Sequence, residues 1–187
     1  VSAIYEDAAG ILWIGTQCGL QKMDRAHPGK ERFTRYQHRF DEYDRPWMQW
    51  IQGIGEYVGE QDSVLFVGSW GAGLLRFDRE TYSQCSFPDV ERDLQFRRWI
   101  SEIHVDHAGD VWVADAEIHK YDPPTGVFRT IFKSKTDYNK AHTHRVFNSA
   151  SGHLLIGTGE QGLVLFDHEL RQFTRLQHDP KDPVSLG

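Results

Sequence analysis

The 187-residue sequence is poor in cysteine, with only two, which excludes a disulfide scaffold and a four-cysteine zinc site. It contains no apolar run near the roughly 20 residues that a membrane-spanning helix requires. It has no excess of basic residues: the formal net charge is −6, so no general electrostatic attraction to nucleic acid is expected. It also lacks any stretch of 3.6-residue hydrophobic periodicity of helical length, which argues against a helical fold.

An initiator methionine and a signal peptide are missing as well. The sequence begins with Val1, and no basic segment followed by an apolar segment stands near it. We therefore expect the chain to be a piece of a longer protein, in which case the missing targeting segment does not indicate a compartment.

The sequence is rich in aromatic residues, at 13 %, and contains 17 glycines, a mixture that favours sheet over helix. Four segments repeat one order of features: an alternating strand, a turn with glycine, an apolar strand, a small-residue turn, a strand ending in aspartate and a last strand. The apolar second strands contain four equivalent residues, 43 to 53 positions apart: Trp13, Phe66, Trp112 and Leu155.

A four-stranded antiparallel unit of this length is typical of a β-propeller blade. The sequence therefore predicts an all-β propeller fold with about four blades, at approximately 1–50, 51–99, 100–145 and 146–187. A β-sandwich is the alternative, but it does not account for the same turns recurring in fixed order. Because propellers of six to eight blades are more usual than four, we expect part of a larger propeller. Its two open blade faces would pair with a second copy or with the remaining blades of the same receptor.

Two stretches carry a family resemblance: IYEDAAGILWIGT at 4–16 and HLLIGT at 153–158, each followed by Gly-Leu. With the linker at 177–186, they resemble the two-component regulator propeller repeat. The third repeat departs from it, since WVAD at 112–115 replaces the Trp-Ile-Gly-Thr of the first. The resemblance covers nearly the whole chain. It implies the periplasmic sensor region of a bacterial receptor that feeds a hybrid histidine kinase or a diguanylate cyclase and senses extracellular, often carbohydrate, signals.

The order of strands in such a blade predicts where a ligand binds. In an antiparallel meander, the turn between the second and third strands lies at the same end as the connection to the next blade. These connections, at 37–50, 88–99, 133–145 and 177–187, are the longer ones. Since binding residues concentrate on loops around the mouth of a scaffold, we expect the ligand at this end.

Aromatic and polar residues gather in these connections and turns, and Trp70 is expected in the turn at 69–73. An exposed indole stacks on the apolar face of a sugar ring, while arginine, aspartate and amide groups bind its hydroxyls. The predicted ligand-binding residues are Trp47, Trp50, Trp70, Arg98, Trp99, Asp115, His142, His144, Arg145 and Gln161. For Trp50 and Trp99, which lead into inner strands, packing between blades is the alternative. Trp13 and Trp112 lie on second strands, where we expect core packing.

Other motifs do not support catalysis. The GTGEQG at 157–162 matches a dinucleotide fingerprint, but a strand follows it where a helix is needed. His142 and His144 form a possible ligand pair, yet no third ligand is set by spacing, so we expect no metal and no cofactor. We interpret the aspartates that end the third strands as turn formers: Asp24, Asp78, Asp122 and Asp167. We expect Cys18 and Cys85 to be free thiols.

The sequence thus predicts a ligand-sensing, non-enzymatic piece of a periplasmic receptor. Its partner would be a small molecule or an oligosaccharide, with no nucleic acid, and it would meet the membrane only through the full-length receptor. Signalling would require different ligand affinities in two receptor states. Two alternatives stay open: a lyase or glycan hydrolase on a propeller scaffold, and a protein-interaction propeller.

Overall fold

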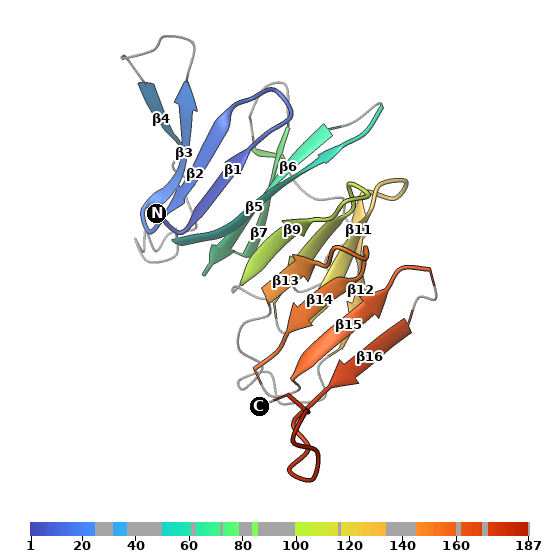
Figure 1. Ribbon diagram of the computed structural model, residues 1–187. Helices are drawn as coiled ribbons and strands as arrows, with labels where there is room; N and C mark the ends of the chain where they lie inside the picture. Colours follow the sequence, from blue (N-terminus) through green and yellow to red (C-terminus); the bar gives the residue numbers. More distant parts are fainter. Residues whose placement is uncertain are drawn as a thin grey trace.

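The computed structural model describes residues 1–24, 32–36, 50–60, 63–71, 73–78, 84–85, 100–115, 117–133, 145–159, 162–169 and 172–186. These residues form four antiparallel sheets of four strands each, and they contain no helix (Figure 1). Each sheet follows chain order from its first strand to its fourth. The predicted all-β architecture of four-stranded meanders is confirmed.

The strand bounds are as follows. The first blade holds β1 (Ala3–Glu6), β2 (Leu12–Thr16), β3 (Gly19–Asp24) and β4 (Arg32–Tyr36). The second holds β5 (Trp50–Val58), β6 (Ser63–Trp70), β7 (Gly73–Asp78) and β8 (Gln84–Cys85). The third holds β9 (Glu102–Val105), β10 (Val111–Ala114), β11 (Ile118–Asp122) and β12 (Val127–Phe132). The fourth holds β13 (Arg145–Asn148), β14 (Leu154–Gly157), β15 (Leu163–Asp167) and β16 (Gln172–Leu176). The second sheet therefore begins at Trp50 and the fourth at Arg145, each one residue before the predicted blade boundary.

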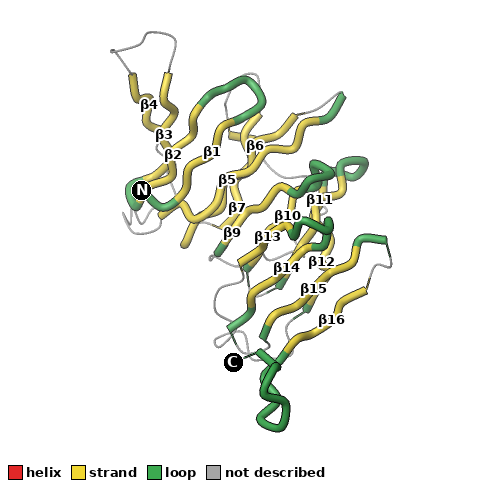
Figure 2. Tube along the Cα trace, viewed as in Figure 1, coloured by secondary structure: helices red, strands yellow, loops and turns green. Residues whose placement is uncertain are grey.

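The four blades stack through their first strands. The strands β1, β5, β9 and β13 lie side by side in chain order, and the first and fourth blades lie at opposite ends of the stack (Figure 2). Three hydrophobic clusters fill the spaces between neighbouring blades. They are centred on Trp13 with Leu65, on Phe66 with Ile103, and on Trp112 with Ile156. A single sheet has no core of its own, so each blade is stable only against its neighbours.

Each blade has two apolar faces because side chains alternate along a strand. We call the face toward the following blade the forward face and the face toward the preceding blade the back face. In the second blade, Phe66 belongs to the forward face, whereas its neighbours Leu65 and Val67 belong to the back face. This alternation leaves two faces without a neighbouring blade in the described structure: the back face of the first blade and the forward face of the fourth.

Candidate functional site

The sheet register brings the starts of the first strands beside the ends of the second strands. Trp50 pairs with Trp70, Glu102 with Ala114, and Arg145 with Gly157. We call this end of the blades the connection end, because the chain passes from one blade to the next there. Four of the predicted ligand-binding residues fall at this end: Trp50, Trp70, Asp115 and Arg145.

Two tryptophans form an aromatic pair at the connection end of the second blade. The rings of Trp50 and Trp70 stack with centroids 5.1 Å apart and planes inclined by 23°. Trp70 is 45 % exposed, while Trp50 is partly buried beneath it. The indole Nε1 of Trp50 is buried and has no hydrogen-bond partner among the described residues. The expectation that Trp70 lies in a turn was wrong: it ends β6, since it pairs with Trp50. The result is a stacked aromatic platform that offers one indole to solvent.

Two charged residues, Glu102 and Arg145, lie where the third blade meets the fourth. Glu102 Oε2 accepts a hydrogen bond of 2.8 Å from the backbone N–H of Val146. Burial raises the pKa of Glu102, and this hydrogen bond and the nearby Arg145 and His104 offset part of the rise. Arg145 is exposed. Sequence reasoning missed Glu102, although one signal was available: the equivalent positions of the first two blades hold the small residues Ala3 and Gly53.

Asp115 lies inside the third blade. It is 5 % exposed, and its Oδ1 accepts a hydrogen bond of 2.6 Å from the N–H of Glu117. The same oxygen lies 3.2 Å from Nε2 of His119, whose Nδ1 lies 3.1 Å from the hydroxyl of Thr130. The carboxylate therefore supports the turn between β10 and β11. A ligand would have to displace His119 to reach this oxygen, so we leave Asp115 out of the candidate site.

Six predicted ligand-binding residues lie outside the described residues: Trp47, Arg98, Trp99, His142, His144 and Gln161. Their roles stay predictions. The candidate site therefore consists of Trp50, Trp70 and Arg145 from the sequence, with Glu102 added by the structure.

The expectation that Trp13 and Trp112 are core residues is confirmed. They are 0 % and 1 % exposed, and each donates its indole N–H to an aspartate six residues earlier. The distances are 2.8 Å from Trp13 to Asp7 and 2.7 Å from Trp112 to Asp106. Because the aspartate also accepts backbone N–H groups of the turn that follows the first strand, this arrangement fastens the second strand to the turn.

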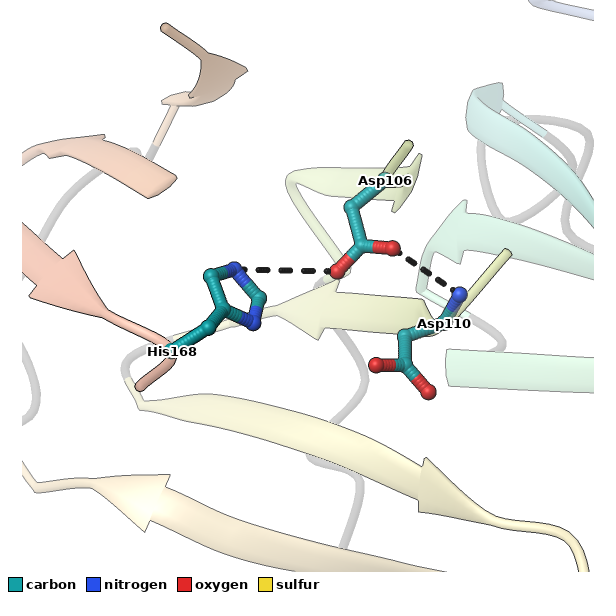
Figure 3. Close-up of side chains that lie close together, drawn as sticks. All are labelled: Asp106, Asp110 and His168. Atoms are coloured by element: carbon teal, nitrogen blue, oxygen red, sulfur yellow. Dashed lines mark hydrogen bonds and ion pairs between the residues drawn. The ribbon is translucent and has the colours of Figure 1, made fainter. Parts of the chain in front are cut away.

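One group of side chains away from the connection end has metal-ligand chemistry. Oxygen and nitrogen atoms of Asp106, Asp110 and His168 lie within 4.8 Å of one another (Figure 3). Asp106 is already engaged by Trp112 and by two backbone N–H groups, and Asp110 pairs with Lys120. The ring of His168 stands edge-on to Trp112 at 5.7 Å. These partners account for the group as packing between the third and fourth blades.

The predicted role of the strand-ending aspartates as turn formers is confirmed for Asp122 and Asp167. Asp122 Oδ2 accepts a hydrogen bond of 2.6 Å from the hydroxyl of Thr125, and Asp167 Oδ1 accepts one of 2.9 Å from the N–H of Glu169. Both aspartates close the turn after a third strand. Cys18 is a free, exposed thiol, as predicted.

Comparison with known proteins supports the fold and the repeat. The model of the two-component regulator propeller family matches residues 1–17, and no curated protein matches the chain. The extracellular domain of a putative hybrid two-component system from B. thetaiotaomicron is similar over 95 % of this chain and 24 % of its own, with 24 % identity and a TM-score of 0.65.

Two further solved structures have a similar fold. Virginiamycin B lyase from Staphylococcus aureus matches 96 % of this chain and 56 % of its own, with 10 % identity and a TM-score of 0.62. The β-propeller domain of Cps50 (Swd1) from Myceliophteria thermophila matches 91 % and 56 %, with 15 % identity and a TM-score of 0.58. This chain therefore spans less than two thirds of the length of each of these three solved structures.

The four stacked meanders and these similarities define a segment of a β-propeller. Residues 1–17, in its first blade, match the two-component regulator propeller family, as the resemblance predicted. No helix among the described residues is long and apolar enough to cross a membrane.

Proposed function

We propose that this chain is a ligand-sensing, non-catalytic propeller segment of a bacterial two-component-type receptor, that it works in the periplasm, and that its ligand is a carbohydrate. The observation that carries the proposal is the stacked pair of Trp50 and Trp70 at the connection end, with Trp70 45 % exposed. The similarity to the extracellular domain of a hybrid two-component system supports the receptor context.

The chemistry of the pair suits a sugar. A large exposed indole, held flat by a second ring, is a surface on which the C–H face of a pyranose can lie with little loss of side-chain entropy. Two polar groups lie at the same end of the next two blades: Arg145, which is exposed and supplies donors for hydroxyl groups, and the carboxylate of Glu102, one oxygen of which accepts the N–H of Val146. Ligand binding then favours whichever receptor state presents the platform open, which is the requirement for passing a signal to another domain.

The test is a titration of the chain with a panel of neutral and acidic oligosaccharides. Binding is monitored by tryptophan fluorescence and by calorimetry. We expect one class of oligosaccharide to bind. Trp70→Ala should weaken that binding by about tenfold or more, equivalent to about 1.4 kcal/mol. Phe33→Ala is the matched control, because Phe33 is also exposed, at 57 %, but lies on β4 away from the connection end.

A propeller-scaffold lyase is the second candidate, favoured by the similarity to virginiamycin B lyase. Mass analysis of the oligosaccharide after incubation distinguishes a sensor from a lyase. An intact ligand supports a sensor, and a cleaved one supports an enzyme. Binding that Trp70→Ala and Phe33→Ala reduce equally would contradict the proposed site, and a panel without any binding would favour a protein-interaction propeller.

A further inference from the structure

We propose that Ser151 is a nucleophilic serine that accepts an acyl group from an activated ester, with His153 as its base and Asp167 as the residue that orients His153. The three residues lie in and beside the turn between β13 and β14, at the end of the fourth blade opposite the connection end. The inference is independent of the ligand site. It concerns one covalent step, after which the serine keeps the acyl group.

The three side chains form one line of hydrogen bonds. The hydroxyl oxygen of Ser151 lies 2.8 Å from Nδ1 of His153, and Nε2 of the same ring lies 3.3 Å from Oδ2 of Asp167. The sheet register sets the second contact, because the adjoining residues Leu154 and Phe166 pair across β14 and β15. A hydroxyl, an imidazole and a carboxylate joined in this order activate the hydroxyl as a nucleophile.

The direction of these hydrogen bonds follows from what each group can donate. An ionised carboxylate only accepts, so the Nε2–H of His153 donates to Asp167. In the neutral imidazole, Nδ1 then has the lone pair that accepts the hydroxyl proton of Ser151. The hydroxyl of Ser149 lies 2.9 Å from that of Ser151 and accepts the backbone N–H of His153, also at 2.9 Å. Ser149 therefore holds the hydroxyl of Ser151 beside the imidazole.

The turn itself does not require these side chains. In the fourth blade it closes through the N–H of Gly152, which donates to the carbonyl group three residues earlier. The same turn closes in the same way through Gly10 in the first blade and Gly109 in the third. The equivalents of Ser151 and His153 in those turns have neither a hydroxyl nor an imidazole: Ala9 and Ile11, and Ala108 and Asp110. The hydroxyl and the imidazole of the fourth blade are thus additional to what the turn needs.

An ester can reach Ser151 from solvent. Ser151 is exposed, and the side chain of His153 is 32 % exposed. A blade that followed the fourth would leave this position open, since the equivalent Ala9 and Ala108 are exposed in blades that are each followed by another. The site is therefore suited to a small acyl donor.

The proposed step forms one bond and breaks one. Oγ of Ser151 attacks the carbonyl carbon of the ester while its proton moves to Nδ1 of His153. The bond between the carbonyl carbon and the leaving oxygen then breaks, and the leaving alkoxide takes the proton from His153. The products are acylated Ser151, an alcohol and a neutral imidazole. Asp167 stays ionised and stabilises the imidazolium that exists between the two proton transfers.

The experiment is incubation of the folded chain with p-nitrophenyl acetate, which is an activated ester. A parallel incubation uses a fluorophosphonate, which loses fluoride and forms a bond to the serine oxygen that resists hydrolysis. Peptide mass mapping locates the modified residue and measures its rate. We expect Ser151 to react at least about tenfold faster than Ser185, a serine whose hydroxyl hydrogen-bonds to the backbone of Asp179.

Substitutions test the base. His153→Ala should lower the rate at Ser151 by about a hundredfold, as expected for removal of a general base. Its melting temperature should stay close to that of the parent, because the side chain of His153 is partly exposed. His107→Ala, at an exposed histidine in the equivalent turn of the third blade, is the matched control and should leave the rate unchanged.

Two substitutions at Asp167 test its positioning role. Asp167→Asn keeps an oxygen for the N–H of Glu169 but removes the charge, so it should lower the rate at Ser151 by at least about tenfold. Asp167→Glu keeps the charge and should restore most of the rate. Equal loss in the two variants would overturn the positioning role, because it would show that Asp167 acts on the turn alone.

Two outcomes would overturn the proposal as a whole. One is an equal rate at Ser151 and Ser185 with both reagents, which would mean that the hydroxyl of Ser151 is not activated. The other is a rate at Ser151 that His153→Ala leaves unchanged, which would mean that the imidazole takes no proton.

Discussion

The indole N–H of Trp112 donates a hydrogen bond of 2.7 Å to Oδ2 of Asp106, and both residues are buried. Oδ1 of the same aspartate accepts the backbone N–H groups of Ala108 and Asp110, at 2.9 and 3.0 Å. Asp106→Ala should lower the free energy of unfolding by about 3 kcal/mol, since each lost hydrogen bond to a buried group contributes about 1 kcal/mol.

Urea unfolding, followed by tryptophan fluorescence, measures this loss. Asp110→Ala is the control: its side chain is 31 % exposed and paired with Lys120, so it should cost below about 1 kcal/mol. Equal losses in the two variants would contradict the expected contribution of the three hydrogen bonds that Asp106 accepts.

Valine at two equivalent glycines should have opposite consequences. Gly68→Val should lower the free energy of unfolding by about 1–3 kcal/mol, because the added carbons collide with Ile100 of the next blade. Gly157→Val should change it by no more than about 0.5 kcal/mol, because among the described residues its Cβ would meet only Arg145, at 3.8 Å and beyond. Thermal unfolding of the two variants beside the parent measures these changes, and a large loss at Gly157 would contradict the space found beside it.

Glu102 should make stability depend on pH. Burial raises the pKa of Glu102 above its ordinary 4.5, so the folded chain binds this proton more tightly than the unfolded chain. The stabilisation is complete below the unfolded pKa and is lost as pH rises through the folded pKa. Glu102→Gln keeps an oxygen acceptor for Val146 and removes the titration. Its stability relative to the parent should therefore increase from pH 4 to pH 7, measured by urea unfolding at both values; a constant difference would contradict the raised pKa.

His119 should contribute to the stability of the third blade through Asp115. His119→Ala removes a partner of a carboxylate that is 5 % exposed, and we expect a loss of about 2 kcal/mol. His153→Ala is the matched control, since its pair with Asp167 has side chains 32 % and 24 % exposed and should contribute below about 1 kcal/mol. Chemical denaturation compares them, and a smaller loss at His119 than at His153 would refute the buried pair.

Most of the strands could be predicted because their signals are local. The alternation of apolar and polar residues and the turn-forming glycines and aspartates act within about ten residues of chain. The predicted last strand of the third repeat, for example, forms β12 (Val127–Phe132). The turn before it closes through Asp122 and Thr125, which are three residues apart. The assignment of Trp70 to a turn failed because its partner, Trp50, lies twenty residues earlier in the sequence.

The sequence by itself determined the repeat, the four-stranded meanders and the end of the blades at which Trp50, Trp70 and Arg145 gather. Only the tertiary structure decided which side chains are available at that end. Asp115 is taken by His119, and Glu102 is held by Val146 of the next blade. Stacking also places Ile51 against Gly15 and Ile100 against Gly68, whereas no other blade meets Gly157 among the described residues. The reason is physical: strand and turn formation follow from neighbours in the chain, whereas burial and pairing depend on residues that meet only when one blade packs on another.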